Sequence, residues 1–354
     1  MTNEYNQNPE HRRSLPGWKG AALLFLVLAL SGLPPCISAA EEAGKKSAPS
    51  DSLEQRLKAV VSIRAEIPDN ARTAAILGGR RQGSGIVIDD KGHILTIGYL
   101  VLEAKKISIL TYDNREMEAL TIGYDQNTGF GLIRAAEPLG IKPVPLGDSG
   151  DIKASSPVVI ISADANDDVH PAMVLSRRNY AGYWEYMVDN AIYTSPPTKF
   201  FSGAGLLDRN LNLVGIGYLF LEDADGKGEN TPGNMFVPIN QFRDIKDDMI
   251  KKGRGPGPEK PWLGISSAEQ FGRVMVLRVT SRGPASDSGI QMGDIILEVG
   301  GTKVGSLEEF YRALWGLGGP GVDVKMKLLQ RNNLVSITVK SGNRMDYYRM
   351  FHGP

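Results

Sequence analysis

Hydrophobic and polar positions between residues 60 and 237 alternate as short apolar runs separated by Gly, Asp and Asn. Runs of this length and spacing are typical of strands in an all-β barrel or sandwich. We predict two successive sets of strands, each forming a barrel. The first set is Val60–Ile63, the hairpin within Gly83–Val101, Ile107–Leu110, Met117–Ile122 and Gly131–Ile133. The second set is Pro157–Ser162, Ala172–Leu175, Tyr183–Val188, Ile192–Ser195, Leu213–Leu219 and Met235–Val237.

Two helices are predicted to flank these strands. Leu53–Ala59 is predicted to form a short helix. In Gln241–Lys252 the apolar residues recur at helical spacing, which predicts an amphipathic helix that closes the unit. Residues 53–252 are therefore predicted to be one domain of two barrels and a terminal helix.

The chain after residue 252 predicts a linker and a second domain. Residues 253–260 are Gly, Pro and charged residues, a composition that favours a linker. Residues 261–341 predict a small α/β module, and residues 342–354 a loose polar tail. The predicted elements of the module are the strands Val274–Val279 and Gly293–Leu297, the helix Leu307–Leu317 and a hairpin of Val322–Leu329 with Leu334–Val339.

The first 40 residues predict a secretory signal peptide. Arg12 and Arg13 precede an apolar run, Ala21–Leu30, and small residues end the segment at Ala40. Cleavage is expected between Ala40 and Glu41, which leaves residues 41–52 as a polar tether. The alternative is an uncleaved anchor in the inner membrane, although the run is shorter than the ~20 residues that span a bilayer. The predicted location is thus periplasmic or secreted.

Composition excludes several classes of function. The chain has 354 residues, of which 40 are basic and 40 acidic, so no long-range field favours nucleic acid as a partner. The single cysteine, Cys36, lies in the predicted signal peptide, so thiol chemistry is not expected in the mature chain. The acidic loops 164–168 and 222–229 lack the glycine offset of a calcium loop. We expect neither a metal nor a cofactor.

Three short strings carry the candidate chemistry. The Gly83–Val101 hairpin ends Thr-Ile-Gly-Tyr-Leu-Val, Gly123–Phe130 follows it, and Phe201–Leu206 reads Phe-Ser-Gly-Ala-Gly-Leu. In order and spacing they resemble the HtrA (Deg) family of trypsin-like serine proteases, over nearly the whole mature chain. That family has Thr-Asn-x-His-Val, Asp-x-x-Thr-Asp-Leu-Ala and Gly-Asn-Ser-Gly-Gly-Pro-Leu at these places. The resemblance implies a mostly β fold: a two-barrel trypsin-like domain of the chymotrypsin type, followed by a PDZ domain.

Carried over position by position, the resemblance retains one catalytic residue. Ser202 stands at the nucleophile position, Tyr99 at the position of the general base and Gly129 at that of the orienting carboxylate. A serine hydroxyl needs a base of suitable pKa, whereas a phenol titrates near ~10 and glycine has no side chain. Phe200–Phe201 also replace the Gly-Asn that shapes the oxyanion hole. The resemblance therefore points to a degenerate member, a pseudoprotease.

Another residue would have to replace the base if the chain were active. His93 and His170 do not map onto the base position, and Lys199 stands in a Pro-rich loop three residues before the serine. Each is better explained as an ordinary surface or loop residue. An active serine endopeptidase that uses Ser202 with a non-standard base remains the alternative.

The C-terminal module resembles a PDZ domain of the bacterial protease type. Its string Pro261-Trp262-Leu263-Gly264-Ile265 matches the carboxylate-binding loop, and Gly283-Pro284-Ala285 matches the following turn. In such a loop successive N–H groups hold a terminal carboxylate while the peptide adds as a strand. Trp262, Leu263, Gly264 and Ile265 are thus the expected peptide-binding residues.

The favoured hypothesis is a periplasmic pseudoprotease that binds peptide C-termini or unfolded segments, in envelope protein quality control or in regulation of an active partner. A second alternative is a scaffolding subunit of a mixed oligomer with an active HtrA-type protease. Family analogy alone implies a homo-oligomer. No nucleic-acid partner is expected.

Overall fold

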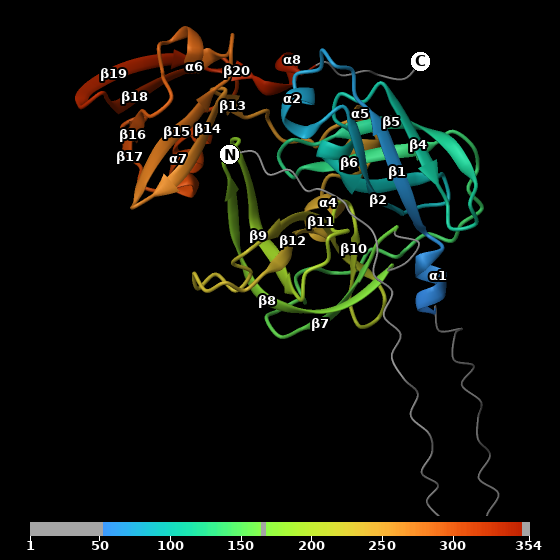
Figure 1. Cartoon of the computed structure of the whole chain (residues 1–354). Helices are drawn as coiled ribbons and strands as arrows, with labels where there is room; N and C mark the ends of the chain where they lie inside the picture. Colours follow the sequence, from blue (N-terminus) through green and yellow to red (C-terminus); the bar gives the residue numbers. More distant parts are fainter. Residues whose placement is uncertain (1–51, 164–167, 349–354) are drawn as a thin grey trace, which may run out of the picture. The chain divides into compact units, whose positions relative to one another are not determined.

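The first set of strands closes into a barrel (Figure 1). The computed structural model describes residues 52–163 and 168–348. Hydrogen bonds join the strands in the order β1–β2–β3–β6–β5–β4, and β1 pairs with β4 to close the barrel. The strands are β1 Val60–Glu66, β2 Arg80–Val87, β3 His93–Ile97, β4 Lys106–Leu110, β5 Glu116–Tyr124 and β6 Phe130–Ala135.

The second set closes in the same way, in the order β10–β11–β12–β9–β8–β7. Its strands are β7 Pro157–Ile161, β8 Val169–Gly182, β9 Tyr186–Ser195, β10 Gly205–Leu207, β11 Leu213–Leu221 and β12 Gly233–Pro238. The prediction of two barrels in a mostly β domain is confirmed. Closure removes the exposed strand edges that an open sheet would present to other chains.

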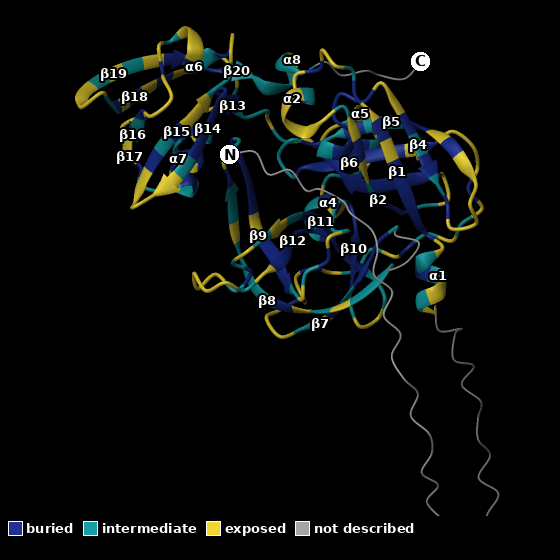
Figure 2. Ribbon diagram, viewed as in Figure 1, coloured by how far each residue is buried: buried dark blue, intermediate teal, exposed yellow. Residues whose placement is uncertain are grey.

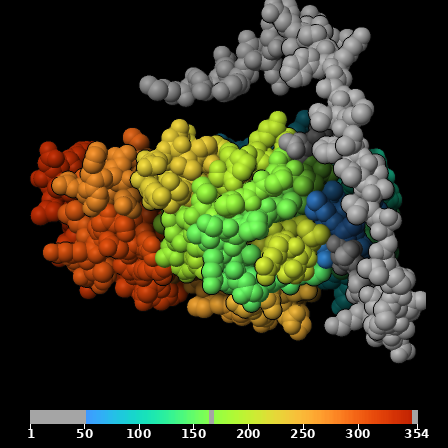
Figure 3. All heavy atoms as spheres, turned by 90° about the horizontal axis from the view of Figure 1, so that it is seen from below, coloured from blue at the N-terminus to red at the C-terminus, as the bar shows by residue number. Residues whose placement is uncertain are grey.

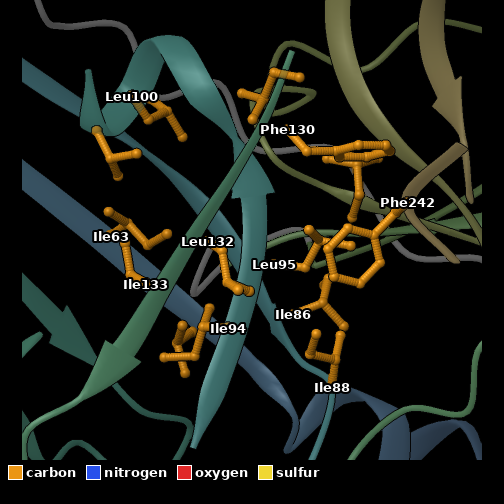
Figure 4. Close-up of a cluster of buried hydrophobic side chains, with 14 of the residues drawn as sticks. Ile63, Ile86, Ile88, Ile94, Leu95, Leu100, Phe130, Leu132, Ile133 and Phe242 are labelled. Atoms are coloured by element: carbon orange, nitrogen blue, oxygen red, sulfur yellow. The ribbon is translucent and has the colours of Figure 1, made fainter. Parts of the chain in front are cut away.

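Inward-facing aliphatic residues fill the barrels, and the barrel strands are mostly buried in Figure 2. Figure 4 shows the core of the first barrel, where Ile86, Leu95 and Leu132 gather with Phe130. Phe242 packs edge-on against Phe130, with ring centroids 5.5 Å apart. Phe242 belongs to the C-terminal helical segment of the domain, so this contact attaches that segment to the barrel core.

The helical segments of this domain are short. They are α1 Leu53–Leu57, α2 Ala74–Leu77, α3 Gly98–Val101, α4 Ile239–Arg243 and α5 Lys246–Lys252. The prediction of one continuous helix over Gln241–Lys252 was wrong, because the chain breaks between α4 and α5. Apolar spacing persists across the break, which is why periodicity did not reveal it.

The long β8–β9 hairpin differs most from the prediction. Tyr183–Val188 was expected to be a strand, but Tyr183–Glu185 form the turn between β8 and β9. Glu185 has a φ of 53°, in the left-handed region that suits a turn. We call Tyr183–Glu185 the hairpin tip.

The C-terminal module, residues 261–341, is built on the sheet β14–β15–β16–β18–β19. These strands are β14 Ile265–Gln270, β15 Arg273–Val279, β16 Ile295–Val299, β18 Asp323–Gln330 and β19 Asn333–Lys340; the short β17, Thr302–Lys303, pairs with β16. Helix α6 spans Pro284–Asp287 and α7 spans Leu307–Trp315. Ser306 and Glu309 form a capping box that starts α7. β14 is an edge strand, so its outer side can accept another strand.

Residues 342–347 are ordered, in contrast to the predicted loose tail. Strand β20, Gly342–Asn343, pairs with β13, Pro261–Trp262, and helix α8 spans Arg344–Tyr347. The tilted ring of Trp262 packs against Tyr347, with centroids 4.9 Å apart. The predicted signal peptide and tether lie outside the described residues, apart from Ser52. Within 52–163 and 168–348, no helix is long and apolar enough to cross a membrane.

Candidate functional site

Ser202 and the residues at the base and acid positions come from three separate segments of the chain. Tyr99 lies on α3, directly after β3, and Gly129 lies between β5 and β6. Ser202 lies in the loop before β10 of the second barrel. The backbone also ties the two barrels together here, since the Ser84 N–H donates to the Ser202 carbonyl at 2.8 Å. The fold therefore assembles the three positions that the sequence strings predict.

The Ser202 hydroxyl bonds to the Tyr99 phenol. The two oxygens are 2.6 Å apart, and the phenol also lies 3.3 Å from the Tyr218 carbonyl, to which it can donate. Burial raises the pKa of Tyr99 to about 12, although the bond from Ser202 acts in the opposite direction. At neutral pH the phenol therefore keeps its proton. A neutral phenol cannot remove the serine proton as an imidazole does.

At Gly129, the space of a side chain is already taken by Tyr186. The φ of Gly129 is +80°, and a Cβ built there would collide with the Tyr186 hydroxyl oxygen. That hydroxyl donates to the Thr128 carbonyl at 2.6 Å. An orienting carboxylate at this position would need both a different backbone conformation and a displaced tyrosine.

The backbone before Ser202 forms bonds within its own loop. In the resemblance, the N–H of Phe200 would be one donor of the oxyanion hole. Here it donates to the Thr198 hydroxyl at 3.1 Å. The Ala204 N–H likewise donates to the Phe201 carbonyl at 3.0 Å. The donor of Phe200 is thus engaged by Thr198, and this arrangement does not offer it to an oxyanion.

The other candidate bases have contacts of their own. His93 is 3% exposed, so it is buried rather than on the surface, and its Nδ1 lies 2.7 Å from the Asp89 carboxylate in the same hairpin. The Nε2 of His170 lies 3.2 Å from the Thr198 hydroxyl. The ammonium of Lys199 lies 4.8 Å from the centre of the Phe200 ring. These contacts explain the three side chains without Ser202.

Sequence reasoning missed the aromatic side chains that fill this region. Tyr218 packs against Tyr99 with ring centroids 5.7 Å apart, and Tyr186 lies 5.1 Å from Tyr218. Trp184 stacks on Tyr186, with 5.8 Å between centroids and an angle of 6° between planes. No local motif marks these residues, because β11 and the β8–β9 hairpin bring them together from distant parts of the chain.

The predicted peptide-binding loop lies at the start of β14. Three of its residues, Leu263, Gly264 and Ile265, direct their N–H groups at one acceptor, the carboxylate of Glu185 in the hairpin tip. Trp262 lies to the other side, against Tyr347 of α8. Sequence reasoning did not identify Glu185; the only available signal was Gly182, a glycine within an apolar run, which can mark a turn.

Metal ligation has no support in the part of the chain that the structure describes, which contains no group of three or more His, Cys, Asp or Glu side chains suited to hold an ion. In the acidic loop after β11, the Asp223 carboxylate accepts from the N–H groups of Gly226 and Lys227 at 2.8 and 3.1 Å. These bonds stabilise the loop itself.

Two family matches follow the division of the fold. Residues 83–216 match the trypsin-like peptidase domain family, and residues 261–341 match the PDZ domain family.

Curated relatives match this chain at low identity. A probable periplasmic serine endoprotease, DegP-like, of Halomonas elongata is 26% identical over 284 residues, which cover 75% of this chain and 57% of that protein. The periplasmic serine endoprotease DegP of Escherichia coli K12 is 24% identical over 297 residues, which cover 78% of this chain and 62% of that protein. The chloroplastic Protease Do-like 1 of Arabidopsis thaliana is 28% identical over 256 residues, which cover 66% of this chain and 57% of that protein. The chain thus spans 57% to 62% of the length of these relatives.

Solved structures share the fold. The HtrA-type protease AlgW with a decapeptide superposes with a TM-score of 0.52 at 19% identity, covering 82% of this chain and 97% of that one. The serine endoprotease from Yersinia pestis gives 0.50 at 22% identity, with 82% and 96% covered. The predicted fold, a trypsin-like domain followed by a PDZ domain, is confirmed by these comparisons.

Proposed function

We propose that this chain, an HtrA-type trypsin-like serine protease homologue with one PDZ domain, binds peptides or unfolded segments without cleaving them. The observation that carries the proposal is the bond between the Ser202 hydroxyl and a neutral phenol, Tyr99, at 2.6 Å. In acyl transfer the nucleophile needs a base, and that base needs an orienting group. Tyr99 cannot serve as the base near neutral pH, and Gly129 provides no orienting group.

The alternative of an active endopeptidase needs a titratable base beside Ser202. The imidazoles of His93 and His170 bond to Asp89 and Thr198 instead. The N–H of Phe200 is engaged with Thr198, so the stabilisation of an oxyanion is weakened as well. The alternative therefore requires both a base and the Phe200 N–H to leave their present partners.

Peptide binding is proposed for the PDZ domain, where the recognition elements are intact. The N–H groups of Leu263, Gly264 and Ile265 converge on a carboxylate position. β14 borders this position as an edge strand of the sheet. Apolar residues of α7 belong to the buried core of the PDZ domain. A peptide that ends in a carboxylate would add along β14 with its terminus in the loop.

A serine-directed fluorophosphonate tests the loss of catalysis. We expect intact-mass spectrometry to find no adduct on the purified protein, under conditions that label an active HtrA-type protease stoichiometrically. Ser202→Ala is the matched control, since it removes only the hydroxyl in question. Stoichiometric labelling that disappears in Ser202→Ala would overturn the proposal.

We propose a periplasmic location, after cleavage between Ala40 and Glu41, because the predicted signal peptide agrees with the periplasmic names of several relatives. The proposed mature domains are 53–252 and 261–341, joined by a linker at 253–260. N-terminal sequencing of protein from the cell envelope should read from Glu41. A start at Met1 in a membrane fraction would instead support the anchored form.

A further inference from the structure

The peptide groove of the PDZ domain is occupied by the hairpin tip of the trypsin-like domain. In Figures 1 and 3 the β8–β9 hairpin is drawn in green and the PDZ domain in orange to red. Hydrogen bonds join this hairpin to α7 of the PDZ domain. We propose that the hairpin tip, with Glu185, is an internal ligand of this groove, and that a peptide carboxylate binds by displacing it. The displacement step rests on the proposed peptide binding; the occupation of the groove does not.

The Glu185 carboxylate occupies the place of a peptide terminus. One oxygen accepts from the N–H groups of Gly264 and Ile265 at 2.7 and 2.9 Å, and the other accepts from Leu263 at 3.0 Å. Glu185 is 4% exposed. A buried carboxylate is tolerated only where donors replace its water, and three N–H groups do so here.

The backbone of the tip continues the likeness to a bound peptide. The Ser267 N–H of β14 donates to the Tyr183 carbonyl at 2.8 Å. From Tyr183 to Glu185 the tip runs opposite to β14, as a strand added antiparallel to its edge would. The carboxylate and the strand contact therefore come from one continuous segment, in the order that a C-terminal peptide would present them.

The inner face of α7 also holds the hairpin. The buried Tyr311 hydroxyl donates to the Gly182 carbonyl at 2.5 Å and accepts from the Glu185 N–H at 3.1 Å. Met187, 7% exposed, belongs to the same buried cluster as Tyr311 and the rest of the PDZ core. Met187 thus adds apolar contact to the polar contacts of the tip.

Charged groups surround the contact. On α8, Arg344 donates to the Glu185 carbonyl at 3.2 Å, and its charge opposes the burial that raises the pKa of the Glu185 carboxyl. At the exposed rim Arg312 of α7 pairs with Asp189 of β9 at 2.7 Å. Asn179 of β8 donates to Glu308 of α7 at 2.8 Å. Both strands of the hairpin, β8 and β9, therefore make polar contacts with α7.

Internal occupation lowers the apparent affinity for any peptide in solution. A ligand on the same chain acts at a high effective concentration. The apparent affinity for a competing peptide is the affinity of the open groove multiplied by the fraction of time that the groove is open. Loosening the tip while leaving the loop intact should therefore strengthen binding of a free peptide.

Hydrogen exchange tests the occupation directly on the full mature chain. In Glu185→Gln an amide N–H faces the loop donors, so we expect the amides of Leu263, Gly264, Ile265 and Ser267 to exchange at least about tenfold faster. Glu222→Gln, in an exposed loop, is the matched control. Unchanged exchange of these amides in Glu185→Gln, with the rest of the protection pattern intact, would overturn the proposal.

Tyr311→Phe is the second variant, for the case in which Glu185→Gln does not fold. It keeps the buried ring and removes only the hydroxyl that bonds to Gly182 and Glu185. Faster exchange at Ser267 would again support occupation, and unchanged exchange would contradict it.

A peptide titration separates this proposal from the proposed function. The probe is a fluorescein-labelled decapeptide that ends Tyr-Trp-Met with a free carboxylate, and its C-terminal amide is the control. We expect Glu185→Gln to bind the free acid at least about tenfold more tightly than the wild type. Faster amide exchange with no binding of the probe would support the internal ligand and count against displacement by peptides. Equal affinities of wild type and variant would overturn the competition.

Discussion

The serine site and the PDZ groove are filled by neighbouring residues of one hairpin, with opposite consequences. Tyr186 takes the space beside Gly129, where the orienting carboxylate would stand. Glu185, one residue earlier, lies in the carboxylate loop of the PDZ domain. In the serine site, Tyr99 and Gly129 stand at the positions where the family has its base and its orienting carboxylate. In the groove the N–H groups of Leu263, Gly264 and Ile265 are present and bond to Glu185, so the proposed peptide binding requires only the displacement of that carboxylate.

Aromatic packing makes the two sites contiguous. The rings run from Tyr99 to Tyr218, from Tyr218 to Tyr186, and from Tyr186 to Trp184 in the hairpin tip. Substituting His at Tyr99 and Asp at Gly129 would therefore not rebuild a triad, because Tyr186 obstructs the carboxylate. The comparison teaches that the aromatic side chains lining the serine site also contact the hairpin tip that fills the groove.

The largest effect is expected from Gly129→Ala, which tests how firmly Tyr186 closes the serine site. The positive φ costs about 1–2 kcal/mol for a residue with a Cβ, and the collision with Tyr186 adds about 1–3 kcal/mol of overpacking. Gly140→Ala is the matched control, since Gly140 has a φ of +64° and open space around its Cβ position. Chemical denaturation should give the larger loss for Gly129→Ala. Equal losses would mean that Tyr186 yields easily.

A smaller effect is expected from Met187→Ala, which tests how firmly the groove is filled. Truncating a buried methionine costs about 2–3 kcal/mol where the site collapses in part. Met173→Ala on β8, where the side chain is 46% exposed, should cost no more than about 0.5 kcal/mol. We expect limited proteolysis to cut the linker 253–260 faster in Met187→Ala only. Equal rates of linker cleavage in Met187→Ala and Met173→Ala would show that Met187 does not stabilise the contact between the hairpin and the PDZ domain.

The smallest effect at neutral pH, and a clear one in alkali, concerns the tyrosines of the serine site. Burial raises the pKa of Tyr99 to about 12 and raises that of Tyr218 well above its ordinary value. Above pH ~10 the unfolded chain loses phenol protons that the folded chain keeps, so stability falls as pH rises, by about 1.4 kcal/mol per pH unit for each such tyrosine.

Thermal unfolding between pH 9 and 12 measures this slope. Tyr218→Phe should reduce the slope by about 1.4 kcal/mol per pH unit, the contribution of one proton. Tyr112→Phe, which changes a 52% exposed residue, should leave the slope unchanged. A slope that is identical in Tyr218→Phe and wild type would show that this phenol is reached by water in the folded state.

Local pattern was enough to predict most of the architecture. Alternation and turn residues predicted both barrels, and the strings around Tyr99, Gly129 and Ser202 predicted which loops would meet. The break between α4 and α5 was not predicted, because the apolar spacing continues through it. The order in residues 342–347 was not predicted either, since β20 depends on pairing with β13, 80 residues earlier in the chain.

What the sequence by itself determined is the pair of domains and the presence of Tyr99 and Gly129 at the family's base and acid positions, because these depend on which residue stands at each position. Only the tertiary structure decided what fills the two sites. Tyr186 reaches Gly129, and Glu185 reaches Leu263, Gly264 and Ile265, across long separations in the chain. Such contacts follow from the length and direction of the β8–β9 hairpin. No local pattern encodes that direction, since strand periodicity describes the two faces of a strand and not the element that its end will meet.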